Sequence, residues 1–386
     1  VNIKAADITA KELAVGGSSS FTAQNLNVDT EIDLGAGVDA NVNDVTARLL
    51  YVQNGGAITA NDINVQSLGF ANNVTAKANN AIANDLLAGQ ESVISMQDVS
   101  VANISLGAQT NMSANNVKDA KSVALDEKAV LTVNNALAAQ SIALEKNASL
   151  NTADIQNAQS IVVKDDAVVN AEAITMGDEA SITSSGGNIK TDALTGGSLT
   201  FNLLTEETEQ IYVGNLTSDS LTVNVNDLTE KQVVIGNYTG GDVSVIGSGS
   251  VTDSFGNDMP DIEKGMQKLA NTLNITGNAE KELVAGQGSV LGEITGKVDT
   301  NGTLTVTGEK VNSFNQGISE MASIALMTWR QENNDMNKRL GELRDSAGEH
   351  GVWVRMTRGE SKYGAQNIKN QYNAYQLGYD EKLSVD

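Results

Sequence analysis

Few residues of this 386-residue chain belong to the types that carry out catalysis or bind metals. The sequence contains no cysteine and a single histidine, His350. A disulfide scaffold, a cysteine-ligated metal site and a zinc site with several histidines are therefore excluded. A Ser-His-carboxylate triad needs histidine as its base, so at most one could form, and residues 1–316 cannot contain it. The Gly-x-Ser-x-Gly motif that often surrounds a nucleophilic serine does not occur either.

Two short glycine motifs could bind a cation or a phosphate in another context. The Gly-Gly-Asp at 240–242 matches part of a calcium-binding repeat, but it occurs once, so we interpret it as a turn. The Gly-Ala-Gly at 35–37 lacks the third glycine and the strand-turn-helix setting of a dinucleotide site. The acidic residues show no spacing that specifies calcium. We therefore expect no cofactor and no metal, and we expect His350 only to begin a strand.

The charge balance restricts the partners of the chain. Its 25 Lys and Arg against 48 Asp and Glu give a net charge of −23. Residues 1–316 hold 16 basic and 38 acidic residues, a net charge of −22, whereas residues 317–386 hold 9 and 10. Nucleic acid requires clustered Lys and Arg, so we expect no nucleic-acid partner. The 40% hydrophobic content is too high for a disordered chain, and no run of about 18 apolar residues predicts a transmembrane helix.

The middle of the chain repeats at an offset of 19 residues. Positions 120–125, 139–144 and 158–163 align as Ala-Lys-Ser-Val-Ala-Leu, Ala-Gln-Ser-Ile-Ala-Leu and Ala-Gln-Ser-Ile-Val-Val. Four columns of the alignment are apolar: Ile104, Val123, Ile142 and Ile161; Leu106, Leu125, Leu144 and Val163; Met112, Leu131, Leu150 and Val169; and Val117, Ala136, Ile155 and Ile174. Apolar residues alternate within each repeat, as they do in strands. The joining segments are rich in Asn, Asp, Gly and Ser, which favour turns.

We therefore predict that residues 1–252 form a right-handed parallel β-helix, a solenoid in which each repeat is one turn. Short strands cannot bury apolar side chains alone, but parallel strands stacked about 4.8 Å apart make each column a continuous ladder. At 19 residues per turn this segment would form about 13 turns and a rod about 60 Å long. Stacked Asn side chains would hydrogen-bond along the same direction. A β-sandwich is the alternative, and it is disfavoured because its strands do not repeat at a constant offset.

Residues 253–311 differ in pattern, and we predict that they cap the open end of the solenoid. A helical pattern starts near Pro260. Its apolar positions fall on one face: Ile262, Met266, Leu269 and Leu273. Further on, the Asn-Gly pair at 301–302 lies between two alternating segments and predicts a β-hairpin.

The remainder of the chain predicts one long helix and two strands. In residues 312–346 apolar side chains keep the three- or four-residue spacing of an α-helix. They are Ile318, Met321, Ala325, Trp329, Met336, Leu340 and Leu343. Residues 347–386 contain alternating segments at 352–357 and 374–380, each with one apolar, aromatic-bearing face and one small or polar face. This pattern is typical of strands in outer-membrane barrels, although soluble hairpins share it.

The order of these segments resembles the start of the translocator domain of type Va autotransporters. The resemblance lies in positions 321–330, 334–345, 351–355, 359–364 and 375–380. Its most specific part is Asn-Lys-Arg-Leu-Gly-Glu-Leu-Arg at 337–344. In that family the equivalent helix threads the barrel pore and joins an exported passenger to the first strand. The family's passengers are usually β-helices, and a capping segment of the autochaperone kind usually precedes the helix.

The resemblance implies an all-β chain whose α-helix at 312–346 threads a pore and whose residues 347–386 begin an antiparallel transmembrane β-barrel. The family barrel has about a dozen strands, so we expect this chain to be a truncated piece of a longer protein. Its partners would be the outer membrane and, during export, the barrel-assembly machinery. The passenger would lie on the cell surface or be secreted.

The resemblance also implies one reaction, self-cleavage in the pore. In members that release their passenger, an Asn side-chain amide attacks its own backbone carbonyl between two adjacent asparagines ahead of the Asn-Lys-Arg motif. The aligned pair here is Asn334-Asp335, and the adjoining Asn333-Asn334 is shifted by one residue. Asn334 and Asp335 are therefore the candidate site, and a simple helical linker is the favoured alternative.

We expect the passenger to be an adhesin rather than an enzyme, with a ligand on host cells, other bacteria or extracellular matrix. The composition of a long, acidic, polar rod suits a contact surface. Two alternatives remain: the rod is the stalk of an enzyme or toxin whose catalytic domain lies upstream of residue 1, or it is a structural surface-layer protein.

Overall fold

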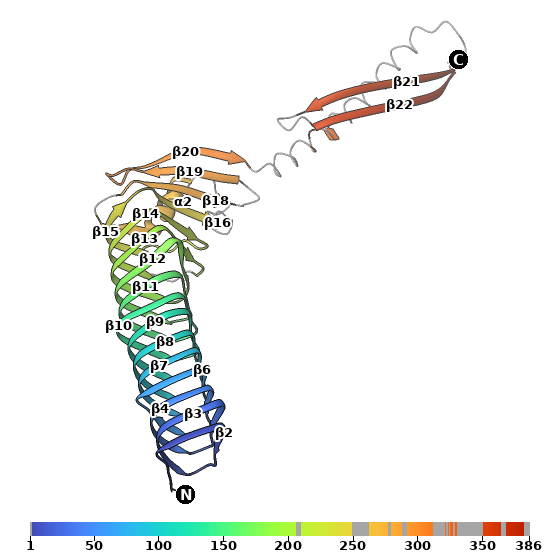
Figure 1. Ribbon diagram of the computed structural model, residues 1–386. Coiled ribbons are helices and arrows are strands. Elements are labelled where there is room, and N and C mark those ends of the chain that lie inside the picture. The colour runs from blue at the N-terminus through green and yellow to red at the C-terminus, as the bar shows by residue number, and fades with distance from the viewer. Residues whose placement is uncertain are drawn as a thin grey trace. The chain divides into compact units, whose positions relative to one another are not determined.

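The computed structural model describes residues 2–205, 210–248, 262–276, 279–287, 292–311, 350–363 and 368–381, and the single positions Met321, Ser323, Ala325, Leu326 and Trp329. The chain is all-β, a β-solenoid of about 13 turns with one short helix among these residues. Figure 1 labels the helix and most of the strands. It divides into two compact units, Val1–Ser289 with Ile294–Glu309, and Val290–Glu293 with Lys310–Asp386.

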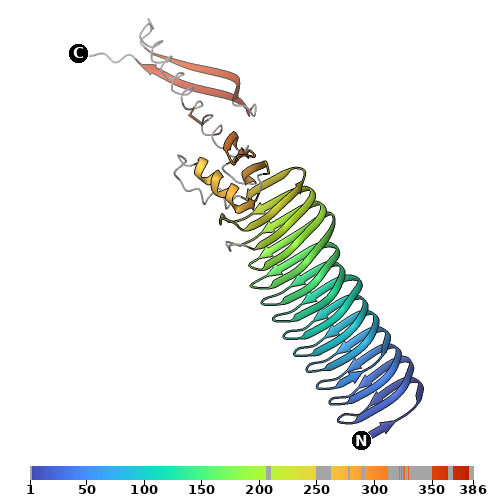
Figure 2. The ribbon, with the colours of Figure 1, turned by 90° about the vertical axis from the view of Figure 1, so that its left-hand side faces the viewer.

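The solenoid is a stack of parallel strands, which Figure 2 shows as a regular series of turns. Its strands are β1 (Asn2–Lys4), β2 (Asp7–Val15), β3 (Ser20–Leu34), β4 (Asp39–Val52), β5 (Ala57–Thr59), β6 (Asp62–Phe70), β7 (Thr75–Ala88), β8 (Val93–Leu106), β9 (Asn111–Leu125), β10 (Val130–Leu144), β11 (Ser149–Lys164), β12 (Val168–Ser185), β13 (Asn188–Leu203), β14 (Ile211–Val225), β15 (Val233–Gly240) and β16 (Val243–Ser248). The parallel β-helix is thereby confirmed over these residues; its right-handed sense stays a prediction.

Three of the four predicted apolar columns are confirmed as ladders. Ile142 is in register with Val123 on one side and Ile161 on the other. Leu144 and Leu150 continue the second and third columns in the same way. These side chains are fully buried, so the alternation of each strand directs its apolar residues into the coil and its polar residues outward.

The fourth column is wrong at one position. Leu137, not Ala136, lies between Val117 and Ile155, and Leu137 is fully buried. The register shifts between Val133 and Ala136 place an extra residue of β10 at the first bend of that turn. The neighbouring strands carry theirs at the second bend instead, so equal 19-residue repeats still differ in register by one residue.

The offset between turns is not constant along the rod. Residues stacked in the first part are 18 or 19 apart, those in the middle are 19 apart, and those near β14 are 22 apart. A fixed period of 19 is therefore wrong outside the middle, because some early turns are one residue shorter and the turns near β14 are three residues longer.

One bend of the coil repeats a left-handed backbone conformation. Ten residues, one in each successive turn, have positive φ: Ser18, Gly37, Gly55, Asn73, Glu91, Gln109, Lys128, Asn147, Asp166 and Gly186. Each such bend stacks on the next; for example, the N–H of Lys128 donates to the carbonyl of Lys146, and that of Asn147 to Asp165. Glycine and asparagine tolerate this conformation best, which explains the short polar segments in the sequence.

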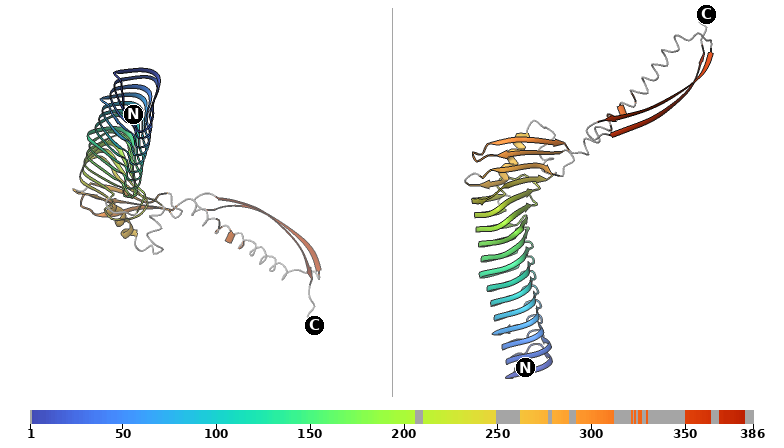
Figure 3. Two further views of the ribbon diagram at one scale, coloured as in Figure 1. Left: turned by 90° about the horizontal axis from the view of Figure 1, so that it is seen from below. Right: turned by 45° about the horizontal axis from the view of Figure 1, so that its top comes forward.

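Beyond β16 a helix and more strands follow: α2 (Ile262–Thr272), β17 (Leu273–Ile275), β18 (Lys281–Gln287), β19 (Gly292–Val298) and β20 (Leu304–Val311). β17 and β18 still pair in parallel with β15 and β16, so the coil register continues past residue 252. β19 then pairs antiparallel with β18, and Figure 3 shows these strands at the end of the coil. The predicted helix is confirmed, with Met266 and Leu269 buried, but Leu273 belongs to β17 rather than to the helix.

The predicted hairpin at 301–302 is also present, with a longer turn than expected. β19 and β20 pair, and Gly302 has a φ of +79°. The carboxylate of Asp299 accepts hydrogen bonds from the backbone N–H groups of Asn301 and Thr303, both at 2.8 Å. These bonds lower the pKa of Asp299, and they make this a five-residue turn instead of a two-residue Asn-Gly turn.

The second unit contains the antiparallel pair β21 (His350–Tyr363) and β22 (Ile368–Glu381). Most of the predicted helix 312–346 lies outside the described residues; the five single positions described there have helical conformation. Within the part of the chain that the structure describes, no helix has the length and hydropathy needed to cross a membrane.

Candidate functional site

Only some of the residues that the sequence singled out for chemistry are among the described residues. Asn334 and Asp335 lie outside the described residues, so self-cleavage stays a prediction. His350 begins β21, as expected, and is exposed opposite Glu381. In the Gly-Gly-Asp at 240–242, Gly240 ends β15, and Gly241 and Asp242 connect it to β16, which agrees with the interpretation of that motif as a turn.

The outer surface of the rod carries ladders of Asp and Asn. One column runs through Asp7, Asn25, Asp44, Asp62, Asn80, Asp98 and Asn116, which are in register from turn to turn. Within it Asn25 donates to Asp7, Asn80 to Asp62 and Asn116 to Asp98, each at 2.6 Å. An amide between two carboxylates supplies the donor that stacked carboxylates lack, so the alternation lets acidic residues pack along the rod.

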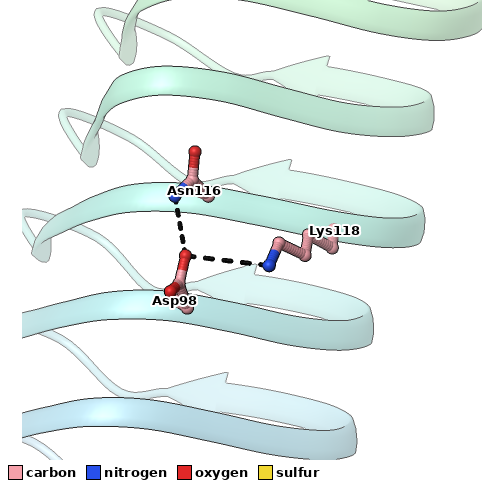
Figure 4. A network of polar contacts seen from close by, with 3 residues as sticks. All are labelled: Asp98, Asn116 and Lys118. Carbon is pink, nitrogen blue, oxygen red and sulfur yellow. Dashed lines mark hydrogen bonds and ion pairs between the residues drawn. The ribbon is translucent and has the colours of Figure 1, made fainter.

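Figure 4 shows one step of this ladder. The Asp98 Oδ1 atom accepts the bond from Asn116 and also faces the Lys118 ammonium at 3.9 Å. Both ion-pair partners are well exposed, so this pair contributes little to stability. The hydrogen bond between successive turns is the recurring element, and the lysine is an addition to it.

The alternation fails at one step, where Asp44 and Asp62 are direct neighbours. Asn43 donates to Asp44 Oδ2 at 3.0 Å. The other oxygen, Oδ1, is buried and has no hydrogen-bond partner among the described residues. Two like charges side by side and a buried acceptor without a donor both oppose folding.

The expected amide ladders are present as well. Asn79 donates to Asn61 at 2.6 Å, and Gln97 donates to Asn79 at 3.0 Å. Further along, Asn134 donates to Asn115 and Asn170 to Asn151. Their uniform spacing makes the exterior a regular array of polar groups.

Two lysines join the end of the coil to the strands beyond it. The Lys281 ammonium donates to the carbonyls of Leu273, at 2.5 Å, and Ala270, at 3.4 Å, next to the C-terminus of α2. Burial lowers the pKa of Lys281. Lys297 pairs with Glu280 at 2.7 Å, and the hydrogen bond and charge of that carboxylate raise its pKa. Sequence reasoning missed both lysines, because neither lies in a repeat.

The β21–β22 hairpin has two unlike faces. On one face six apolar side chains are 60–76% exposed: Val352, Val354, Met356, Tyr375, Leu377 and Tyr379. The other face pairs Trp353 with Gly378 and Arg355 with Gln376. There the Trp353 ring covers Gly378, and the Tyr372 ring covers Gly359 across the pair. The dyad pattern was predicted; the aromatic-glycine pairs were not, although a register aligning Trp353 with Gly378 would have shown them.

No metal centre emerges from the geometry. Among the residues described, no group of three or more His, Asp or Glu side chains is placed to hold an ion.

Comparison with known proteins gives two partial similarities. The serine protease EatA of Escherichia coli O78:H11 is 28% identical over 135 residues, which cover 31% of this chain and 10% of that protein. The serine protease EspC of Escherichia coli O127:H6 is 27% identical over 136 residues, with the same coverage. The chain thus spans about a tenth of the length of these relatives. No family model and no solved structure matches the chain. The similarities together with the β-solenoid fit the passenger of an autotransporter.

Proposed function

We propose that the β-solenoid is the exported passenger of an autotransporter and acts as an adhesin, anchored through a barrel that begins at β21. The observation that carries the proposal is the order of two structures in one chain. A water-adapted coil, polar outside and apolar inside, is followed by a hairpin with its apolar side chains outside. An autotransporter needs this order, because its passenger ends in solvent and its first strands face lipid.

The exposed apolar side chains of the hairpin support its assignment to the membrane. An outward row such as Val354, Leu377 and Tyr379 is costly in water and favourable in lipid. A two-stranded sheet cannot span a bilayer alone, since its open edges would carry unpaired backbone groups. The proposal therefore predicts further dyad-patterned strands encoded downstream of Asp386. It also implies that the barrel-assembly machinery of the outer membrane inserts the barrel.

The rod supports adhesion through its surface. Ladders of Asp, Asn, Gln, Ser and Thr expose many hydrogen-bonding groups on a stiff frame, and long solenoid surfaces serve as binding surfaces in other repeat proteins. The rod would present them on the cell surface or after secretion.

A second function, a stalk that carries a catalytic domain, is favoured by a separate observation. Both relatives are named as serine proteases. Residues 1–316 contain no histidine and so cannot themselves hold a Ser-His-carboxylate triad. A protease domain would have to lie upstream of residue 1, and a rod of this kind would hold it away from the membrane.

Two experiments separate these functions. The complete gene is sequenced and expressed in E. coli, and exposure of the rod is followed by external protease on intact cells. The 386-residue chain, purified in mild detergent, is tested for binding to epithelial cells, bacteria and matrix proteins. Adhesion without an upstream catalytic domain supports the adhesin. A globular domain before Val1 with no adhesion by the rod supports the stalk, and a gene lacking further strands overturns both.

The candidate self-cleavage site is tested in the same cells. If Asn334 is the reacting residue, passenger appears in the medium, and Asn334→Ala abolishes its release while surface exposure is unchanged. Asn333→Ala is the matched control for the shifted pair. Passenger that stays attached in the wild type assigns residues 312–346 to a simple linker.

A further inference from the structure

The outer surface of the coil is hollowed where the turns of β11, β12, β13 and β14 follow one another. Two open hollows lie there, of about 340 Å³ and 550 Å³. Asn170, Lys190 and Asp192 line both, so the two hollows adjoin, and together they are called the groove below. Its walls come from a single face of consecutive turns, so its shape depends only on the coil itself.

The floor of the groove is a row of side chains in register. Asn151 pairs with Asn170, Asn170 with Lys190, and Lys190 with Tyr212. Parallel strands are about 4.8 Å apart, so these four positions extend over about 14 Å along the axis. The step of about 4.8 Å from one strand to the next is comparable to the length of one pyranose unit of an oligosaccharide.

The polar groups of the groove remain available. Asn170 donates to Asn151 at 3.0 Å and Asn151 donates to Ser149 at 3.1 Å, which leaves the Asn170 carbonyl oxygen open. Beside this row Glu172 and Asp192 line the groove. Lys190, Glu172 and Asp192 make no side-chain ion pair or hydrogen bond with the described residues. Amide, ammonium and carboxylate groups thus alternate within reach of one ligand.

Tyr212 ends the row with an aromatic ring. Its side chain is 42% exposed, so part of the ring remains uncovered. The same column further toward the N-terminus holds Asn41, Thr59, Lys77 and Ser95, and none of these is aromatic. Compared with these positions, only Tyr212 places an exposed aromatic ring beside hydrogen-bond donors and acceptors.

The chemistry of the groove selects among ligands. A peptide adding as a strand would need an unpaired strand edge, but β12 and β13 are each paired on both sides. A polyanion would be repelled by Glu172 and Asp192. An apolar ligand would remove water from these charges without replacing its hydrogen bonds. A saccharide fits the polar groups and the ring of the groove, since its hydroxyls both donate and accept hydrogen bonds and its C–H face packs on an aromatic ring.

We propose that the groove running from Asn151 to Tyr212 binds an uncharged oligosaccharide along the rod axis. Tyr212 would stack against one sugar ring, and Asn170, Lys190 and Asp192 would bind hydroxyls of this ring and its neighbours. This inference rests on the proposed adhesin function and names its ligand class.

The test uses the 386-residue chain in mild detergent. Its binding is measured to immobilised neutral oligosaccharides of hexoses and N-acetylhexosamines, with sialylated and uronate-containing ones beside them, and then by titration of the best binder. Tyr212→Ala should weaken binding at least about tenfold, as loss of an aromatic anchor does, and Tyr212→Phe should retain most of it. Asp192→Asn, an exposed change that leaves the fold intact, should weaken binding by a smaller factor. Tyr51→Ala is the matched control, because Tyr51 is 37% exposed on another column.

Three results would overturn the saccharide assignment: no binding to any neutral oligosaccharide, binding to the acidic ones only, or equal binding by wild type, Tyr212→Ala and Asp192→Asn. The same variants are tested for cell adhesion. A chain that adheres to cells unaffected by Tyr212→Ala refutes the groove and leaves the adhesin standing, whereas a chain that adheres to nothing refutes the adhesin itself.

Discussion

The coil and the β21–β22 hairpin are built on the same alternation and use it in opposite ways. In the coil Leu144 is fully buried, whereas in the hairpin Leu377 is 76% exposed. Each coil turn is in register with a turn above and a turn below, and the hairpin strands pair only with each other. The alternation of apolar and polar residues therefore predicts strands. Whether the apolar face is buried or exposed depends on whether further strands stack on both sides.

The sharpest test of this difference replaces one leucine in each region. Leu144→Ala should lower the free energy of unfolding of the coil by about 2–5 kcal/mol, because it leaves a cavity in a continuous ladder. Leu377→Ala should change the unfolding of the coil by less than about 0.5 kcal/mol. Both are measured by denaturant titration of the full chain, with circular dichroism as the probe, since Trp329 and Trp353 both lie outside the coil. If both variants lowered the free energy of unfolding of the coil by similar amounts, the proposed difference between the two regions would be wrong.

The hydrogen bonds of Lys281 at the end of the coil do not repeat from turn to turn, and substitution of Lys281 tests their contribution. Lys281→Met should cost about 1–3 kcal/mol, because it leaves the carbonyls of Leu273 and Ala270 without their donor. Lys268→Met, an exposed change in α2, is the control and should cost little. An equal effect of the two would show that the carbonyl contacts do not stabilise this end of the coil.

Lys281 also makes stability depend on pH. Burial lowers its pKa below the ordinary 10.5, so the unfolded chain binds its proton more tightly than the folded one. Stability attributable to this group should therefore rise as the pH increases from the folded pKa toward 10.5. The difference between wild type and Lys281→Met is measured by thermal unfolding over that range. A difference that falls with pH would contradict the burial of the ammonium group.

The repeated left-handed bend is tested by glycines. An added Cβ at Gly55 meets no atom within 4 Å, so only its φ of +67° opposes a side chain. Gly55→Ala should cost about 1–2 kcal/mol. Gly16→Ala also meets no atom but has no positive φ, and it should be neutral or slightly stabilising. Melting temperatures of the two variants measure the difference, and a neutral Gly55→Ala would show that the bend can relax.

Most of the solenoid could be predicted from the sequence, and the positions misplaced within its turns share one physical cause. Ile142 and Leu150 were found because three neighbouring turns have the same length, which keeps these positions 19 residues apart. Leu137 was missed because β10 carries its extra residue at a different bend. Lys190 and Tyr212 were not linked, because turns there are longer and the offset is 22. Only the hydrogen-bonded register locates such residues; an alignment that allows one-residue insertions at either bend would have found Leu137.

The smallest effect concerns the one irregular step of the Asp-Asn ladder. Asp62→Asn would place an amide next to Asp44, whose Oδ1 is buried without a donor, while Asn80 keeps its acceptor. It should therefore raise the free energy of unfolding by about 0.5–1 kcal/mol, through one new hydrogen bond and one fewer like-charge contact. Asp98→Asn is the control: Asp98 already lies between Asn80 and Asn116, so it should gain nothing. If Asp62→Asn also gains nothing, the ladder does not contribute through alternation, and the coil owes its stability to its apolar interior alone.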